Sequence, residues 1–182
     1  VTGSLTYPCS VMLIGAMNPC PCGYFGHPTR PCTCSRNRVS QYLAKVSGPL
    51  LDRLDLHIDV MPVDFENISS RAGAETSASI KSRVNRARVL QRERYGDAGT
   101  SCNARLTPAL LQTACPVSEN GMKLLRSAFD KLGLSARAYE RILKVARTIA
   151  DLDESESIEG VHIAEAVQYR SLDRKYWLAG KE

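Results

Sequence analysis

Hydrophobic and polar residues follow two different periods along this chain, and the period changes after residue 65. In the first part, residues 4–7 alternate, residues 11–16 form a continuous apolar run, and residues 55–60 alternate again. Alternation is typical of a strand with one buried face, and a short apolar run is typical of a central strand covered on both faces. Residues 1–65 are therefore predicted to contain strands of an α/β sheet.

The second part of the chain has the spacing of amphipathic helices. Ser or Thr precedes several apolar-periodic stretches and Gly follows some of them, which are the usual signals of helix starts and ends. We expect a helical bundle at 77–182, joined to the α/β part by a linker at 66–76, so the predicted fold class is α/β plus α. Helices are predicted at residues 77–95, from 107 onward, and at 118–132, 135–152 and 161–169.

A loop rich in Pro and Gly follows the first apolar run and holds four of the seven cysteines. In this Cys loop (residues 18–37), two Cys-x-Cys pairs can each present two thiols together, because alternate residues of an extended segment point the same way. Zn²⁺ prefers four such ligands in a closed structural site. His27 could replace one ligand, and four reduced thiols without a metal are the other interpretation. The candidate zinc ligands are Cys20, Cys22, Cys32 and Cys34.

The net charge of +5 is concentrated in two stretches. Residues 81–94 hold six basic side chains and one acidic one, and residues 30–45 hold four basic side chains and no acidic one. Basic surfaces suit phosphate or nucleic acid as partners. The alternative interpretation of such a run is a solvated helix face.

The cysteine count and the hydropathy pattern both favour a cytoplasmic protein. An odd number of cysteines, seven, is unusual for a secreted disulfide framework. No apolar run approaches the roughly 18–20 residues that cross a bilayer. The chain also begins without the basic and apolar regions of a signal peptide. We expect reduced thiols and no membrane partner.

Four longer motifs are more specific than these patterns. They are Ala-Met-Asn-Pro-Cys-Pro-Cys-Gly at 16–23, Ser-Gly-Pro-Leu-Leu-Asp-Arg-Leu-Asp-Leu-His at 47–57, Leu-Ser-Ala-Arg-Ala-Tyr-Glu-Arg-Ile-Leu-Lys-Val-Ala-Arg-Thr-Ile-Ala-Asp-Leu at 134–152, and Tyr-Arg-Ser-Leu-Asp-Arg at 169–174. In this order the set closely resembles the bacterial Mg-chelatase-like AAA+ ATPases of the competence (ComM/YifB) type. The resemblance covers nearly the whole chain. It implies the C-terminal strands of a AAA+ nucleotide-binding core, a Cys-rich insertion and a helical lid.

The resemblance also implies roles for four residues. Asn18 corresponds to sensor 1, which orients the attacking water, and Arg53 corresponds to an arginine finger given to a neighbouring subunit. Arg137 corresponds to the sensor 2 arginine that couples nucleotide state to the lid. Arg141, one helical turn further on, is a second-choice nucleotide contact.

Each of these assignments has a purely structural alternative. Asn18 would then cap the loop before Pro19, and Arg137 would be an ordinary surface residue. The alternative for Arg53 is an ion pair with a neighbouring carboxylate, either Asp52 or Asp55.

The function that the resemblance implies is an ATP-driven hexameric ring that moves on DNA, in this family branch migration during recombination and natural transformation. ATP and Mg²⁺ would be its cofactors in the full-length protein. No Gly-x-x-x-x-Gly-Lys-[Ser/Thr] and no apolar strand ending in Asp-Glu occur, so the chain alone is not expected to hydrolyse ATP. Two alternatives remain open. One is a magnesium chelatase motor subunit, which the Cys loop disfavours, and the other is a non-enzymatic, zinc-stapled DNA-binding module.

Overall fold

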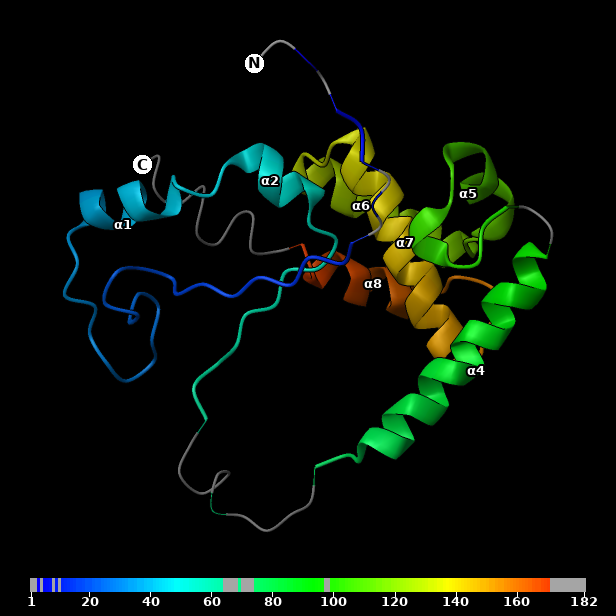
Figure 1. The fold of residues 1–182 in the computed structure, drawn as a ribbon, viewed down its shortest axis with the longest axis horizontal. Coiled ribbons are helices and arrows are strands. Elements are labelled where there is room, and N and C mark those ends of the chain that lie inside the picture. Colours follow the sequence, from blue (N-terminus) through cyan, green and yellow to red (C-terminus); the bar gives the residue numbers. More distant parts are fainter. Residues whose placement is uncertain are drawn as a thin grey trace. The chain divides into compact units, whose positions relative to one another are not determined.

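A computed structural model of the chain describes residues 11–63, 74–96 and 99–170, together with residues 3, 5–7, 9 and 69. The chain divides into two compact units, Val1–Lys45 and Val46–Glu182. The described part is mainly helical (Figure 1). Most of the predicted linker at 66–76, residue 4 of the first predicted strand, and the end of the predicted lid beyond residue 170 lie outside the described residues.

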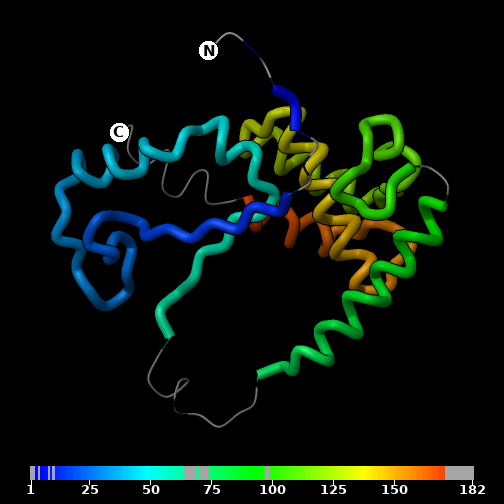
Figure 2. The backbone as a smooth tube through the Cα atoms, in the orientation of Figure 1, coloured from blue at the N-terminus to red at the C-terminus, as the bar shows by residue number. Residues whose placement is uncertain are grey.

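The first unit consists of an extended segment, the Cys loop and one helix, as the backbone trace in Figure 2 shows. The loop turns at Gly23 and Gly26, whose φ angles of 83° and 78° lie in the left-handed region that glycine adopts without a steric penalty. Helix α1 (Arg36–Leu43) begins after Ser35, whose hydroxyl accepts a hydrogen bond from the backbone N–H of Arg38. This cap fixes the point at which the loop becomes helical.

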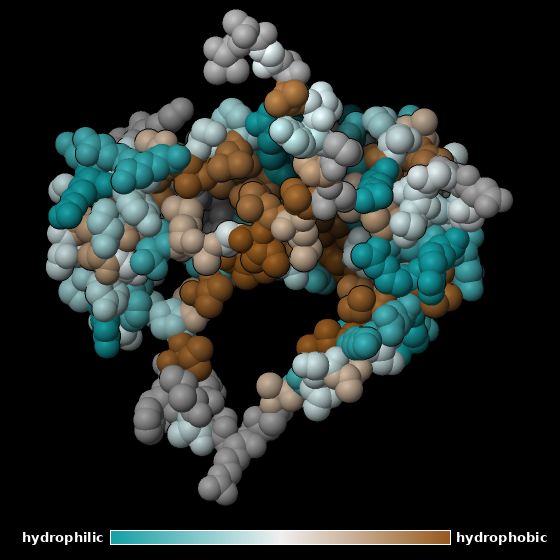
Figure 3. Space-filling view, viewed as in Figure 1, coloured by the Kyte–Doolittle hydropathy of each residue, from teal (hydrophilic) through white to brown (hydrophobic). Residues whose placement is uncertain are grey.

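The described residues contain no β-strand, which corrects the sheet expected for residues 1–65. Residues 5–7, 11–16 and 55–60 lie outside any ladder, and the single bridge joins Val117 to Ile158 in the helical part. A strand needs a neighbour to pair its backbone N–H and C=O groups, and the described chain offers these segments none. Apolar surface is visible on the face drawn in Figure 3. The large apolar side chains of these three segments are exposed. Among them are Val11, Met12, Leu13, Ile14, Ile58 and Val60.

The second unit contains the predicted helices, with boundaries set by local caps. Thr107 and Pro108 start α5, Ser118 and Ser135 cap α6 and α7, and Gly133 ends α6 in the left-handed conformation at φ 56°. Helix α2 was not predicted, although Ser47 caps it and Pro lies in its first turn. The elements are α2 (Gly48–Arg53), α4 (Ser77–Tyr95), the 3₁₀ turn η1 (Asn103–Arg105), α5 (Pro108–Ala114), α6 (Glu119–Leu132), α7 (Ala136–Leu152) and α8 (Gly160–Gln168).

Helix α7 is the centre of the second unit and packs against α4, α5, α8 and η1. Its buried face combines three alanines, Ala138, Ala146 and Ala150, with larger side chains. Among the described residues, no helix has the length and apolar character needed to cross a membrane. The core is formed by Leu106, Leu111, Leu125, Ile142, Leu143, Ala146, Ala150, Ile158, Ile163 and Ala166, among others.

A buried charged network ties α4, α7 and η1 together. Arg147 and Asp151 are fully buried on α7 and lie 3.1 Å apart. Arg94 of α4 donates two hydrogen bonds to the same carboxylate, and Asn103 of η1 donates a third at 2.8 Å. Arg147 also donates to the carbonyls of Ser155 and Glu156. Because every charge has a partner, this network can exist in an apolar core.

Candidate functional site

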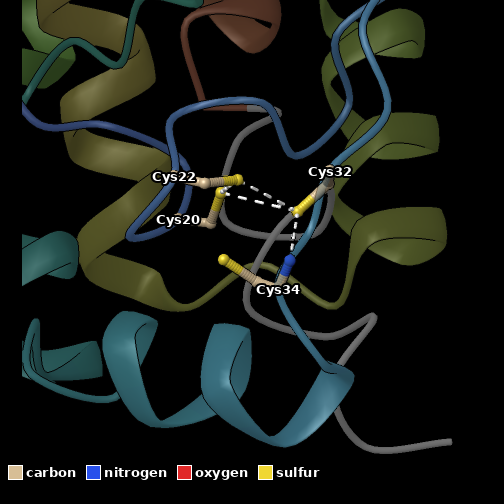
Figure 4. A group of neighbouring side chains, drawn as sticks. All are labelled: Cys20, Cys22, Cys32 and Cys34. Carbon is tan, nitrogen blue, oxygen red and sulfur yellow. Dashed lines mark hydrogen bonds between the residues drawn. The ribbon is translucent and has the colours of Figure 1, made fainter.

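The four thiols of the Cys loop converge on one point, as predicted from their spacing. Their sulfur atoms all lie within 4.8 Å of one another (Figure 4). Cys20 is buried and the other three are partly exposed. The sulfur of Cys20 lies 3.3 Å from that of Cys22 and 3.7 Å from that of Cys32, and Cys22 and Cys32 are 3.5 Å apart. The four cysteines are free, so no disulfide accounts for this convergence.

The spacing of three of the sulfur atoms is close to that in a tetrahedral zinc site. With a Zn–S bond of about 2.3 Å, the edges of a regular tetrahedron are about 3.8 Å long. The separations among the sulfur atoms of Cys20, Cys22 and Cys32, 3.3–3.7 Å, are close to that edge, and the sulfur of Cys34 lies within 4.8 Å of each of them. In addition, the backbone N–H of Cys34 points to the sulfur of Cys32 at 3.4 Å, an interaction that stabilises a thiolate.

The protonation of these thiols differs across the cluster. The backbone N–H of Tyr24 lowers the pKa of Cys22 to about 5, with help from the neighbouring thiols and against desolvation. For Cys32, the Cys34 N–H favours the thiolate, but desolvation and the neighbouring thiols outweigh it and raise the pKa to about 12. Desolvation also raises the pKa of Cys34. One thiolate thus disfavours others beside it, and a bound cation would remove this repulsion.

His27 does not belong to the group of converging ligand atoms. Its Nδ1 accepts hydrogen bonds from the backbone N–H groups of Thr29 and Arg30, at 3.2 and 3.0 Å. The imidazole therefore holds a turn inside the Cys loop. The interpretation in which His27 replaces one cysteine ligand is not supported by this geometry.

Asn18 lies in the first unit, at the end of the extended segment and directly before the Cys loop. Its side chain is exposed, and it makes no hydrogen bond to the described part of the chain. It therefore does not cap the loop, which was the structural alternative for this residue. Arg53 and Arg137, the other two residues with implied catalytic roles, lie in the second unit.

Arg53 ends helix α2 and is exposed. Its guanidinium donates a hydrogen bond to the carbonyl of Pro49 at 3.0 Å. The two neighbouring carboxylates face other arginines: Asp55 lies 2.7 Å from Arg141, and Asp52 lies 3.6 Å from Arg170. The ion pair expected in the structural alternative for Arg53 is thus absent from the described contacts.

Arg137 is an exposed residue in the first turn of α7. Within the described ranges it has no hydrogen bond or ion pair. A cation at the N-terminus of a helix is unfavourable, because the helix dipole places partial positive charge there. Local stability therefore gives no reason for an arginine at this position.

Arg141, one turn after Arg137 on α7, contacts the chain that follows α2. Its guanidinium donates to the backbone carbonyl of Arg53 and to the Asp55 carboxylate. Arg170, directly after α8, donates to the carbonyl of Leu54 at 2.9 Å. Neither contact was predicted from the sequence. Arg141 had been proposed as a nucleotide contact, and Arg170 was noted only as part of the motif at 169–174.

Two further contacts involve His57. Its backbone N–H donates to the carbonyl of Tyr169 at 2.8 Å, and its Nε2 lies 3.2 Å from the carbonyl of Leu51. We refer to residues 52–57, which the arginines and Tyr169 hold, as the finger segment.

The basic residues of α4 divide into those with an ion pair among the described residues and those without one. Arg83 pairs with Glu75 at 2.9 Å, Arg86 with Glu154 at 2.8 Å, and Arg94 with Asp151. The remaining ones include Arg88 and Arg92, which line a surface hollow together with Arg105 of η1. The charge run is therefore partly a set of helix-surface ion pairs and partly a local basic surface.

Comparison with known proteins identifies relatives along the whole chain. Family models described as "Magnesium chelatase, subunit ChlI C-terminal" and "Magnesium chelatase, subunit ChlI" match residues 74–170 and 1–68. Uncharacterized protein YifB of Escherichia coli is 39% identical over 173 residues, which are 93% of this chain and 33% of the relative. Competence protein ComM of Haemophilus influenzae is 40% identical over 174 residues, 93% of this chain and 32% of the relative. The chain spans about a third of the length of these relatives.

Proposed function

Because this chain belongs to the magnesium chelatase ChlI family, we propose that it forms the C-terminal part of an ATP-driven AAA+ motor that acts on DNA. One relative is named "Competence protein ComM". The proposed activity is branch migration during recombination and natural transformation. It would be performed in the cytoplasm by a hexameric ring of the full-length protein with ATP and Mg²⁺.

The observation that carries this proposal is the placement of Arg53. The two neighbouring carboxylates, Asp52 and Asp55, pair with Arg170 and Arg141. Neither of them therefore neutralises the exposed guanidinium of Arg53. An exposed guanidinium at the end of a short helix is suited to reach a nucleotide bound by the next subunit. There it would stabilise the charge on the transferring phosphoryl group, which is the role of an arginine finger.

Asn18 and Arg137 complete the proposed machinery. The amide of Asn18 would orient the water for in-line attack on the γ-phosphate. Arg137 would contact the nucleotide phosphates and report their state to the lid. Its position at the N-terminus of α7 supports this role, because helix dipole and guanidinium both favour a bound anion there.

Stimulation of ATP hydrolysis tests the proposal against the other two functions. In the full-length protein we expect added DNA to raise the hydrolysis rate and a porphyrin to leave it unchanged. Porphyrin-dependent hydrolysis would favour the magnesium chelatase alternative. Salt-dependent DNA binding without any nucleotide hydrolysis would favour the non-enzymatic DNA-binding module.

We also propose that the Cys loop binds one Zn²⁺ through Cys20, Cys22, Cys32 and Cys34. The convergence of the four sulfur atoms within 4.8 Å, with three of them 3.3–3.7 Å apart, supports this assignment. Four thiolates fill the coordination shell, so the metal would have a structural role and leave no position for a substrate. A metal-fixed loop would hold exposed basic residues of the loop and of the start of α1 in place to contact DNA phosphates. These are Arg30, Arg36 and Arg38.

Replacement of Cys32 and Cys34 by Ser tests the role of the loop in DNA binding. We expect the double variant of the full-length protein to lose DNA affinity while ATP affinity stays unchanged. Replacement of Cys9, an exposed thiol outside the cluster, is the matched control. Equal DNA affinity in wild type and the double variant would refute the proposed DNA contact.

A further inference from the structure

We infer that Arg141 and Arg170 are positioning residues that fasten the finger segment (residues 52–57) to the helical lid, so that Arg53 moves together with the lid. The inference rests on the proposed function, in which Arg53 is the arginine finger. It assigns Arg141 a role different from a nucleotide contact.

The fastening uses the backbone of the finger segment as well as its side chains. Arg141 donates to the carbonyl of Arg53, and Arg170 donates to the carbonyl of Leu54 at 2.9 Å. One backbone amide is also engaged, since the N–H of His57 donates to the carbonyl of Tyr169 at 2.8 Å. Three backbone groups of the segment are therefore bound to two parts of the lid, the N-terminal half of α7 and the residues that follow α8.

The carboxylates on either side of Arg53 direct the two arginines to these carbonyls. Asp55 lies 2.7 Å from Arg141, and Asp52 lies 3.6 Å from Arg170. The Asp55 side chain is 62% exposed, so this ion pair alone would hold little. The Arg170 side chain is only 3% exposed, and its bond to a backbone carbonyl is shielded from water. The segment is thus attached through the buried guanidinium of Arg170 and the partly buried guanidinium of Arg141.

This arrangement has a consequence for the mechanism. Arg53 lies inside the fastened segment, and Arg137 lies one turn from Arg141 on the same face of α7. A lid that shifts with nucleotide state would carry the backbone of Arg53 with it through Arg141 and Arg170. Because a misplacement of about 1 Å can cost about a hundredfold in rate, a loosened segment would weaken catalysis without touching the nucleotide.

Hydrogen exchange of the full-length protein tests the attachment itself. We expect Arg141→Gln to speed the exchange of the His57 amide and its neighbours, because their contact with the lid loosens. Arg126→Gln removes an exposed arginine from α6 and serves as the matched control. Unchanged exchange around residue 57 in Arg141→Gln would overturn the inference.

ATP hydrolysis in the same variants tests whether the attachment positions the finger. We expect Arg141→Gln to lower kcat by about 10- to 100-fold with an unchanged KM for ATP. Arg170→Lys keeps the charge but loses the planar, forked donor geometry, so we expect a loss in the same direction. The positioning role would be overturned if Arg141→Gln exchanged faster around residue 57 but kept the wild-type kcat, while Arg53→Ala was inactive.

The two proposals fail in distinguishable ways. If Arg53→Ala itself has wild-type turnover, the arginine-finger assignment is wrong, and the positioning role falls with it. The exchange measurement would still show whether Arg141 fastens the segment. If Arg53→Ala is inactive and Arg141→Gln behaves as wild type in both measurements, only the inference made here is wrong.

Discussion

The Cys loop (residues 18–37) and the helical part (residues 74–170) reach a defined structure by different means. In the loop, Cys20 is the only residue that the structure describes as buried, and four thiols converge without a disulfide. In the helical part, an apolar core and a saturated network of charges are buried around α7. We therefore expect the order of the loop to depend on the proposed zinc ion and the order of the helices not to, so that the two parts respond to different perturbations.

Removal of zinc should have the largest effect, confined to the Cys loop. Structural zinc sites contribute roughly 10–16 kcal/mol of apparent binding free energy at neutral pH. With a strong chelator we expect the four loop thiols to become reactive towards a thiol reagent, while the helical far-UV circular dichroism stays unchanged. A parallel loss of helical signal would contradict the independence of the two parts. Zinc content measured before chelation provides the reference.

Loss of the buried carboxylate should damage the helical part most. Asp151→Asn leaves the buried guanidinium of Arg147 and the partly buried one of Arg94 without their counter-charge. We expect the free energy of unfolding to fall by about 3–5 kcal/mol. Urea denaturation followed by circular dichroism measures it. Asp130→Asn, an exposed site on α6, should change stability little, and an equal loss there would contradict the network's role.

Acid should weaken zinc binding to the Cys loop. The pKa values of Cys32 and Cys34 are raised, so these thiols carry protons at neutral pH and must release them to bind the metal. Release of at least these two protons predicts that zinc affinity falls about a hundredfold or more for each pH unit lowered. Competition with a zinc-binding dye between about pH 6 and about pH 8 measures how zinc affinity changes with pH. An affinity independent of pH would contradict a thiolate site.

The smallest expected effect is at a helix cap. The Ser135 hydroxyl accepts a hydrogen bond from the N–H of Ala138 at 3.1 Å and starts α7. We expect Ser135→Ala to cost about 1 kcal/mol of unfolding free energy, because this N–H loses its partner. Ser127→Ala, inside α6, is the control and should be nearly neutral. A loss in Ser135→Ala no larger than in the control would show that the cap is dispensable.

The sequence predicted what is decided locally. Ser118, Ser135 and Gly133 mark helix ends because a cap needs only residues within one turn. The Cys cluster followed from the spacing of two pairs in one loop.

What the sequence did not predict depends on distant partners. Residues 11–16 have the composition of a strand, but a strand needs a paired neighbour, and none exists among the described residues. The contacts of Arg141 and Arg170 with the finger segment join parts of the chain far apart in sequence. No periodicity or motif spacing encodes such contacts.

ATP turnover by the full-length Arg53→Ala variant, measured beside its ATP affinity, tests the central claim most directly. The account predicts a loss of about a thousandfold or more in turnover, because the finger acts on the transferring phosphoryl group. ATP affinity should be retained, since the proposed role of Arg53 is to complete the site of a neighbouring subunit. Wild-type turnover in Arg53→Ala would contradict the proposed motor mechanism.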